Sequence, residues 1–248
     1  MTNLNWWKEN WKVNLPDIQK ILKSKISNFI DEEKIIRLDN WVTLRATNIK
    51  MKWWIYQFEW KEYYVCRDKK DLINHIKWNK KLNIDNTRFK LNQLITTFVT
   101  DMSQLFLGMK EFNEDISNWD TENVINMREM FWYCLNFNCD IFNWNTSNVK
   151  NMWWMFTQAE TFNCDISNWN TSNVENLEWM FYYAKRFNQP IWKWNTSNVK
   201  NMRTMFQWTE YFNQDLSKWN VENVTSHNLF DEKTNMRWKQ ESKPKFKN

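Results

Sequence analysis

Glycine is nearly missing from this chain, with one residue, Gly108, among 248. The chain as written therefore has no glycine-rich phosphate loop and no G-x-S-x-G nucleophile elbow, and it has no H-E-x-x-H metal motif. Acidic residues are plentiful, but no two of them can be paired for acid–base chemistry from the sequence alone. We therefore predict no catalytic residues and a protein that is not an enzyme.

Metal-ligating residues are also few. The candidates are Cys66, Cys134, Cys139, Cys164, His75 and His227. The cysteines show no CxxC spacing, so a zinc site is not expected, and no cofactor is predicted. Cys139 and Cys164 lie one repeat apart, within possible disulfide range. We expect free thiols there, because nothing signals an oxidising compartment.

Long apolar runs are missing as well. No run approaches the roughly 18 apolar residues that span a bilayer, so no membrane span is predicted. Residues 1–12 lack the apolar stretch of a secretory signal peptide, so none is predicted, although a truncated or internally started gene stays open. Localisation is not determined by these features.

The net charge of +5 is unevenly distributed. Residues 1–98 carry +8, residues 99–230 carry −6 and residues 231–248 carry +3. Such a division indicates three physically different segments. We predict a cap domain over 1–98, five repeats over 99–230 and a polar C-terminal tail over 231–248.

A 25-residue repeat dominates the middle segment. Phenylalanine, tryptophan, valine and methionine each recur at this step, and such strict self-similarity is the signature of a repeat architecture. The predicted repeat core consists of Phe112, Trp119, Val124, Met127, Phe131, Phe137, Trp144, Val149, Met152, Phe156, Phe162, Trp169, Val174, Leu177, Phe181, Phe187, Trp194, Val199, Met202, Phe206, Phe212, Trp219 and Val224.

Each repeat predicts a short strand, a turn and a short helix. In the third repeat the strand is expected over 164–169, the Asn-Thr-Ser-Asn turn over 170–173 and a helix of one or two turns over 174–181. A unit this short cannot bury its own apolar face, so neighbouring repeats must stack into one continuous core. The predicted class is α/β, a leucine-rich-repeat-like solenoid of short parallel strands and short helices with a small α+β N-terminal cap.

An asparagine ladder (Asn113, Asn138, Asn163, Asn188, Asn213) and a partial aspartate ladder (Asp115, Asp140, Asp165, Asp215) accompany the core. Such oxygen-bearing side chains raise the possibility of calcium. Pro190 interrupts the aspartate ladder, however, and no glycine-rich nonapeptide is present. We expect these side chains to bond backbone turns instead.

The run from Phe162 to Val174, FNCDISNWNTSNV, with Met180-Phe181 after it, closely resembles the BspA-like leucine-rich-repeat surface proteins. That family includes a 25-residue repeat class first noted as mycoplasmal proteins of unknown function. The resemblance covers about residues 80–230. It implies a leucine-rich-repeat-like solenoid that serves in surface attachment or ligand binding, with no catalytic residues. It also implies a cell-surface location, although exported members carry a signal or lipid anchor and this chain shows neither.

Tryptophan is as abundant as glycine is scarce, with 20 residues. Five lie on the repeat ladder, while many of the others stand where a turn calls for glycine. These include Trp41, Trp60, Trp154, Trp179, Trp192 and Trp208. We hypothesise that the gene comes from a lineage that reads UGA as glycine but is translated here with UGA as tryptophan. The alternative is a genuinely tryptophan-rich protein whose exposed indoles stack on sugars or bases.

The head is expected to combine helices and strands. Apolar periodicity predicts a helix over 16–30 and a second over 69–77 capped by Asp68, with strands over 35–38, 42–46, 55–58 and 63–66. Its positive charge is scattered and no nucleic-acid motif accompanies it, so a cap is favoured over a nucleic-acid surface. His75 falls off the apolar face of its helix and is expected in solvent.

The tail is lysine-rich and is expected to fray. The sequence as a whole predicts a non-catalytic repeat protein that presents a surface for a protein or glycan ligand, in attachment or adhesion. The alternative is an intracellular protein–protein scaffold. Glycan binding through exposed indoles depends on the extra tryptophans being real.

Overall fold

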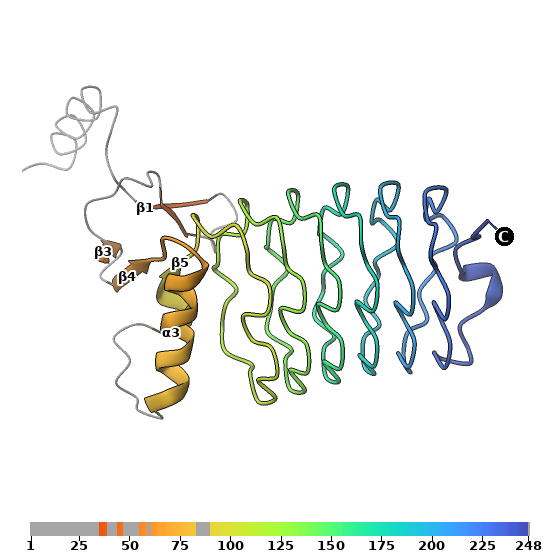
Figure 1. Cartoon of the computed structure of the whole chain (residues 1–248), viewed down its shortest axis with the longest axis horizontal. Helices are drawn as coiled ribbons and strands as arrows, with labels where there is room; N and C mark the ends of the chain where they lie inside the picture. Colours follow the sequence, from red (N-terminus) through yellow and green to blue (C-terminus); the bar gives the residue numbers. More distant parts are fainter. Residues whose placement is uncertain (1–34, 39–43, 47–54, 59–60, 83–89, 248) are drawn as a thin grey trace, which may run out of the picture.

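The computed structural model describes residues 35–38, 44–46, 55–58, 61–82 and 90–247. A head of short strands and one helix lies at one end, and coils of chain lie side by side from there to the C-terminus (Figure 1). The elements are β1 (Ile35–Arg37), β2 (Leu44–Ala46), β3 (Ile55–Phe58), β4 (Lys61–Val65), α3 (Lys69–Leu82), η1 (Leu91–Gln93), β5 (Leu94–Ile95) and η2 (Gln240–Ser242).

The head contains two small sheets. β1 pairs antiparallel with β2, and a second sheet has the order β3-β4-β5, with β3 and β4 antiparallel and β4 and β5 parallel. α3 begins where the Asp68 carboxylate accepts the N–H of Asp71 at 2.8 Å, which satisfies one of the free donors of the first turn. Leu72 and Ile76, one turn apart, are buried and attach α3 to the core.

The expected head elements differ from these by a few residues. β3 has the predicted bounds, while β1, β2 and β4 shift by one or two residues at their ends, and α3 extends to Leu82. The helix expected over 16–30 lies outside the described residues, as do Trp41 and Trp60.

Six successive coils are joined by single parallel β-bridges rather than by long strands. We number them one to six by their bridging residues, Asp101, Asn126, Asn151, Asn176, Asn201 and Ser226. After each bridge, N–H groups of alternate residues donate to carbonyls of the following coil. In coil three, Met152, Trp154, Phe156 and Gln158 donate to Asn176, Glu178, Met180 and Tyr182 over 2.7–3.2 Å.

The expected strand over 164–169 and helix over 174–181 are wrong. Residues 164–169 form no strand, and 174–181 form the bridge at Asn176 followed by turns. The reason is the backbone of Trp179, which has a φ of +59°. A helix requires negative φ at every residue, so a left-handed residue ends it. The resulting zigzag directs alternate N–H groups along the stack.

Aromatic ladders fill the interior of the coils. Phe162 stacks between Phe137 and Phe187, with ring centroids 5.8 and 5.6 Å away. Trp169 lies 6.4 Å from Trp144 with nearly parallel planes, and its indole N–H donates to the Ile141 carbonyl at 3.1 Å. The other four ladder tryptophans make the equivalent bond. Every predicted core residue is buried except Val224, which is partly buried against the core.

Polar ladders bind each coil to the next from outside the core. The Asn138 side-chain oxygen accepts the backbone N–H of Asn163 at 2.8 Å, and the other asparagines of this ladder repeat the bond. The Asp165 carboxylate accepts the N–H of Ser167 at 2.8 Å, which is an Asx turn. These side chains therefore serve the backbone, as the turn interpretation predicts.

The head is fastened to the stack by Arg45. Its guanidinium pairs with Asp120, at 2.8 Å from Nε, and with Glu122. Thr97 donates to the same Asp120 carboxylate at 2.9 Å. Asp120 is buried with 2% exposure, and the equivalent residue in the following coils is asparagine, such as Asn145. The carboxylate at this one position thus matches the cation that the head supplies.

The C-terminal tail packs on the end of the stack, contrary to the expected fraying. Trp238 is buried at 4% exposure, with its ring edge-on to Phe212 at 4.9 Å. Its indole N–H donates to the Gln214 carbonyl at 2.7 Å, and the Leu216 N–H donates to the Ser242 carbonyl at 2.7 Å. The polar composition concealed the apolar residues Trp238, Pro244 and Phe246, of which Trp238 covers the last phenylalanines of the core.

None of the helices within the described ranges is long and apolar enough to cross a membrane.

Candidate binding surface

Aromatic side chains outside the core ladders form a continuous line across coils two to five. This aromatic stripe consists of Trp132, Trp153, Trp154, Trp179, Tyr182, Tyr183 and Trp208. Neighbouring rings have centroids 4.5–5.8 Å apart, so the line has no break between coils. All seven side chains are partly or well exposed. Apolar surface gathered in one exposed patch is typical of a binding site.

The stripe follows from the zigzag backbone after each bridge. Residues whose side chains enter the core there, such as Met180 and Phe181, are flanked by Trp179 and Tyr182, which lie outside it. Because the coils stack at a constant step, exposed residues at the same repeat position come side by side. Aromatic residues at these positions in several coils therefore merge into one surface.

Cations lie over the faces of several exposed rings. The Arg128 guanidinium is 4.3 Å from the Trp153 ring centre and also pairs with Glu129, at 2.5 Å. The Lys185 ammonium is 4.8 Å from the Tyr183 ring centre and 2.9 Å from Glu160. The surface thus combines aromatic faces with charged hydrogen-bonding groups. Stacking partners beside hydrogen-bonding groups suit a sugar ring, which has an apolar face and hydroxyls at its edge.

Three tryptophans of the stripe have left-handed backbone. φ is +59° at Trp154 and Trp179 and +62° at Trp208, close to the +71° of Gly108. A side chain in this region costs roughly 1–2 kcal/mol that glycine avoids. Other coils place Glu129 and Thr204 at the position of Trp154, also with positive φ, so the conformation belongs to the repeat position. It accords with glycine at these three sites, and it does not extend to Trp192, where φ is not positive.

Two tryptophans of the stripe, Trp153 and Trp154, lack the hydrogen bond that every ladder tryptophan makes through its indole N–H. Every ladder tryptophan donates to a backbone carbonyl, whereas Nε1 of Trp153 and of Trp154 are buried with no hydrogen-bond partner in the described structure. An orphaned buried donor costs about 1–3 kcal/mol. Trp154 therefore combines two unfavourable features that glycine would remove. The reading of UGA does not change the identity of Tyr182, Tyr183 or Lys185, because none of them is a tryptophan in this sequence.

No cysteine or histidine is among the residues of the aromatic stripe. All four cysteines are free thiols. Burial raises the pKa of Cys164 to about 12, and its Sγ donates to the Cys139 carbonyl at 2.7 Å, so it is a poor nucleophile. His75, expected in solvent, instead lies half-buried with its ring 4.1 Å from that of Tyr64. Within the described ranges, no three His, Cys, Asp or Glu residues group as metal ligands do.

Sequence reasoning identified Trp154, Trp179 and Trp208 but missed Tyr182, Tyr183 and the cations beside them. The signal for three of them is present in the sequence, because Tyr182, Tyr183 and Lys185 occupy variable positions between a Met-Phe pair and the next ladder phenylalanine. Aligning the repeats by position and asking which variable positions are aromatic would have found them.

Comparison with known proteins gives one family. A family model described as "Mycoplasma protein of unknown function, DUF285" matches residues 78–176 and, a second time, residues 142–243. The two matches overlap and together extend from α3 through all coils into the tail. No curated protein and no solved structure matches the chain.

Proposed function

The chain belongs to this Mycoplasma repeat family, DUF285, and we propose that it is a non-catalytic binding protein whose aromatic stripe holds a glycan in surface attachment. The observation that carries the proposal is the line of partly exposed rings across four coils, with Arg128 and Lys185 over two of its faces. Its members Tyr182 and Tyr183 are present whether UGA codes for tryptophan or for glycine. A surface that runs across stacked coils suits an extended ligand with repeated units.

We further propose that the stack is a leucine-rich-repeat-like solenoid of the BspA-like surface-protein kind. The support is the 25-residue step of its hydrogen bonds and core ladders, together with the FNCDISNWNTSNV motif. The cell-surface location rests on that resemblance.

The test uses an immobilised mucin glycoprotein and the same protein after enzymatic deglycosylation, as two surfaces for interferometry. The full chain should bind the glycosylated surface and lose binding on the deglycosylated one. A double Tyr182→Ala, Tyr183→Ala variant should bind at least about tenfold more weakly, which corresponds to about 1.4 kcal/mol. Tyr211→Ala is the matched control, because Tyr211 is 62% exposed and lies outside the stripe.

Two results would reject glycan binding by the stripe. One is equal binding to both surfaces, which would favour the protein–protein scaffold. The other is unchanged affinity of the double tyrosine variant. Near-UV circular dichroism of the ladder tryptophans verifies that each variant keeps its stacked core.

A further inference from the structure

The last coil ends in a row of backbone donors without acceptors. In coils one to five, N–H groups at four alternate positions donate to the following coil; in coil five these are Met202, Thr204, Phe206 and Trp208. The equivalent residues of coil six are His227, Leu229, Asp231 and Lys233. Among the described residues, none of these four N–H groups has a hydrogen-bond acceptor. Unpaired donors along one edge are a template for another backbone segment.

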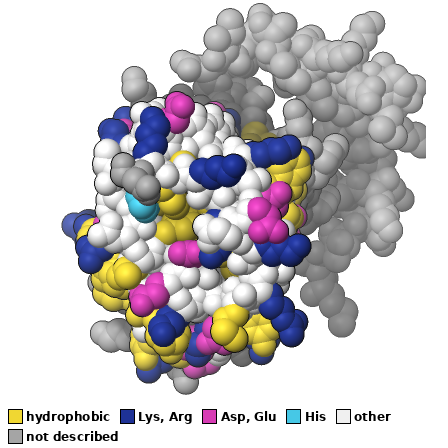
Figure 2. All heavy atoms as spheres, turned by 90° about the vertical axis from the view of Figure 1, so that its right-hand side faces the viewer, with side chains coloured by type: hydrophobic (Ala, Val, Ile, Leu, Met, Phe, Trp, Pro, Cys, Tyr) yellow, Lys and Arg dark blue, Asp and Glu magenta, His cyan; other side chains and the backbone are white. Residues whose placement is uncertain are grey.

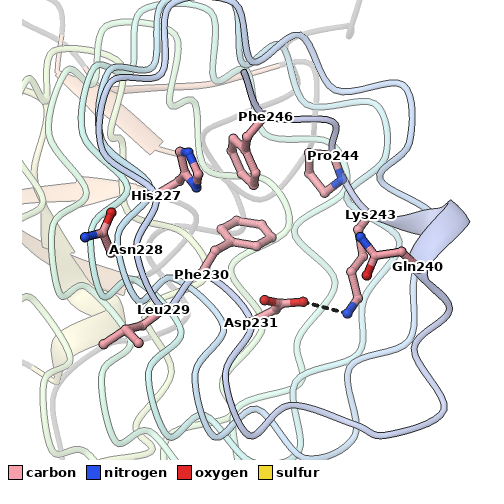
Figure 3. A pocket seen from close by; sticks show the side chains of 9 residues that line it. All are labelled: His227, Asn228, Leu229, Phe230, Asp231, Gln240, Lys243, Pro244 and Phe246. Carbon is pink, nitrogen blue, oxygen red and sulfur yellow. Dashed lines mark ion pairs between the residues drawn. The ribbon is translucent and has the colours of Figure 1, made fainter. Parts of the chain in front are cut away.

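A hollow of about 280 Å³ lies against this edge. On one side are His227 and Phe230 of coil six, and on the other are Pro244 and Phe246 of the tail (Figure 3). The His227 ring stacks on Phe246 with centroids 4.3 Å apart. Asp231 and Lys243 form an ion pair of 2.6 Å at one side of the hollow. The hollow is therefore apolar at its rings and polar at its margin.

The tail closes the core but leaves this edge open. It pairs with the opposite part of coil five, where the Ser242 carbonyl accepts from Leu216, and Trp238 covers Phe206 and Phe212. At the position of Phe206, coil six has Asp231, so the phenylalanine ladder stops there. The described tail thus supplies a cap for the core and no carbonyls for the four donors.

We propose that this end of the stack binds an extended acidic peptide segment of a partner protein, which pairs with the open edge of coil six. In the coils, the acceptors of such donors are carbonyls of alternate residues, as at Ser226, Asn228, Phe230 and Glu232. All bridges between coils are parallel. A peptide that runs parallel to residues 227–233 and accepts through the carbonyls of its alternate residues reproduces that pattern. One apolar side chain of the peptide then enters the hollow.

Charge selects an acidic segment. Residues 231–248 carry +3, and two of their three acidic side chains, Asp231 and Glu241, lie beside Lys243 and Lys239. Figure 2 looks onto this end of the stack and shows an apolar patch near the histidine, with Lys and Arg side chains and some Asp and Glu side chains around it. Complementary charge steers association and weakens with salt.

A second copy is a poorer occupant, because its first coil is engaged by its own head. Lys69 of α3 donates to Asp101 and Ser103 of coil one at 3.1 and 2.6 Å, and Arg45 of β2 pairs with Asp120. Stacking one chain on another would require these contacts to open.

The probe is the heptapeptide acetyl-Asp-Leu-Glu-Val-Asp-Leu-Glu-amide with a fluorescent label, titrated with the full chain and followed by anisotropy. A basic counterpart with Lys at each acidic position is the matched peptide. The acidic peptide should bind at least about tenfold tighter than the basic one at low salt, and less tightly as salt rises. Hydrogen exchange should show added protection at residues 227–233 and none in coils two to four.

Lys245→Glu with Lys247→Glu reverses two exposed charges beside the hollow and should weaken binding by about tenfold or more. Lys150→Glu, an exposed charge change in the middle of the stack, should leave it unchanged. Equal binding of both peptides, protection outside 227–233, or an unaffected Lys245/Lys247 variant would overturn the proposal. Concentration-dependent self-association that blocks the peptide would show that a second copy occupies the edge instead. The peptide pairs with coil six, whereas Tyr182 and Tyr183 lie in coil four, so loss of glycan binding in the double tyrosine variant should leave the peptide result unaffected.

Discussion

Phe162→Ala tests whether the stacked core stabilises the coils. Phe162 is fully buried, its ring lies 3.9 Å from that of Phe156, and it stacks on Phe137 and Phe187 in the adjacent coils. Truncation of a buried phenylalanine costs about 3–5 kcal/mol, including the cavity that remains. We expect the upper half of this range, because the hydrogen bonds between coils prevent the ladder from collapsing into the gap.

The assay is urea denaturation followed by tryptophan fluorescence. With a denaturant slope of about 2 kcal/mol per molar, a loss of about 4 kcal/mol lowers the midpoint by about 2 M. Tyr211→Ala, an exposed aromatic truncation, should change stability by less than about 0.5 kcal/mol. A Phe162→Ala midpoint that coincides with that of the Tyr211→Ala control would refute the reasoning.

Three further predictions follow from the head, the histidine and the extra tryptophans. Arg45→Ala should destabilise the head by about 3 kcal/mol, because it leaves the buried Asp120 carboxylate without a cation. Adding Asp120→Asn should restore most of this stability, and a double variant no more stable than Arg45→Ala would contradict the pairing. Burial lowers the pKa of His75, so the folded head favours the neutral imidazole ring. The urea midpoint should stay constant above about pH 6.5 and fall as the pH drops below it, with a smaller fall in His75→Gln. A midpoint that rises on acidification would exclude this cause. Peptide mass spectrometry on protein from its native host should find glycine at Trp154, Trp179 and Trp208 if UGA is recoded, and tryptophan there would reject the hypothesis.

The repeat length and the burial of its ladders could be read from the sequence, because identical residues at a constant step must occupy identical environments. Phe162, Trp169 and Val174 are all buried. The local backbone could not be read in the same way. The apolar spacing of Val174, Leu177 and Phe181 is compatible with a helix, and only the left-handed φ at Trp179 excludes it.

The termini of the stack were harder to predict, because their contacts are made once and leave no periodic signal. The polar composition of 231–248 suggested fraying, while a few apolar residues, Trp238 above all, pack the segment against the core. The pairing of Arg45 with Asp120 joins residues 75 positions apart. Asp120 was not predicted to pair with a cation, although it is the one carboxylate at a repeat position that otherwise holds asparagine.

The aromatic stripe illustrates the same limit for function. Trp179 and Tyr182 could be seen to be neighbours in sequence, but the approach of Tyr183 to Trp208, at 5.8 Å between ring centres, depends on the stacking of coils. A surface shared by several repeats becomes visible only once the repeats are placed side by side.

The binding role of the stripe is tested most directly by nuclear magnetic resonance of the chain with isotope-labelled tyrosine rings, titrated with a mucin glycopeptide. The account predicts that the ring signals of Tyr182 and Tyr183 shift with glycopeptide concentration while that of Tyr211, which is exposed outside the stripe, stays in place. Shifts at Tyr211 without shifts at Tyr182 and Tyr183 would contradict it, as would a spectrum that the glycopeptide leaves unchanged.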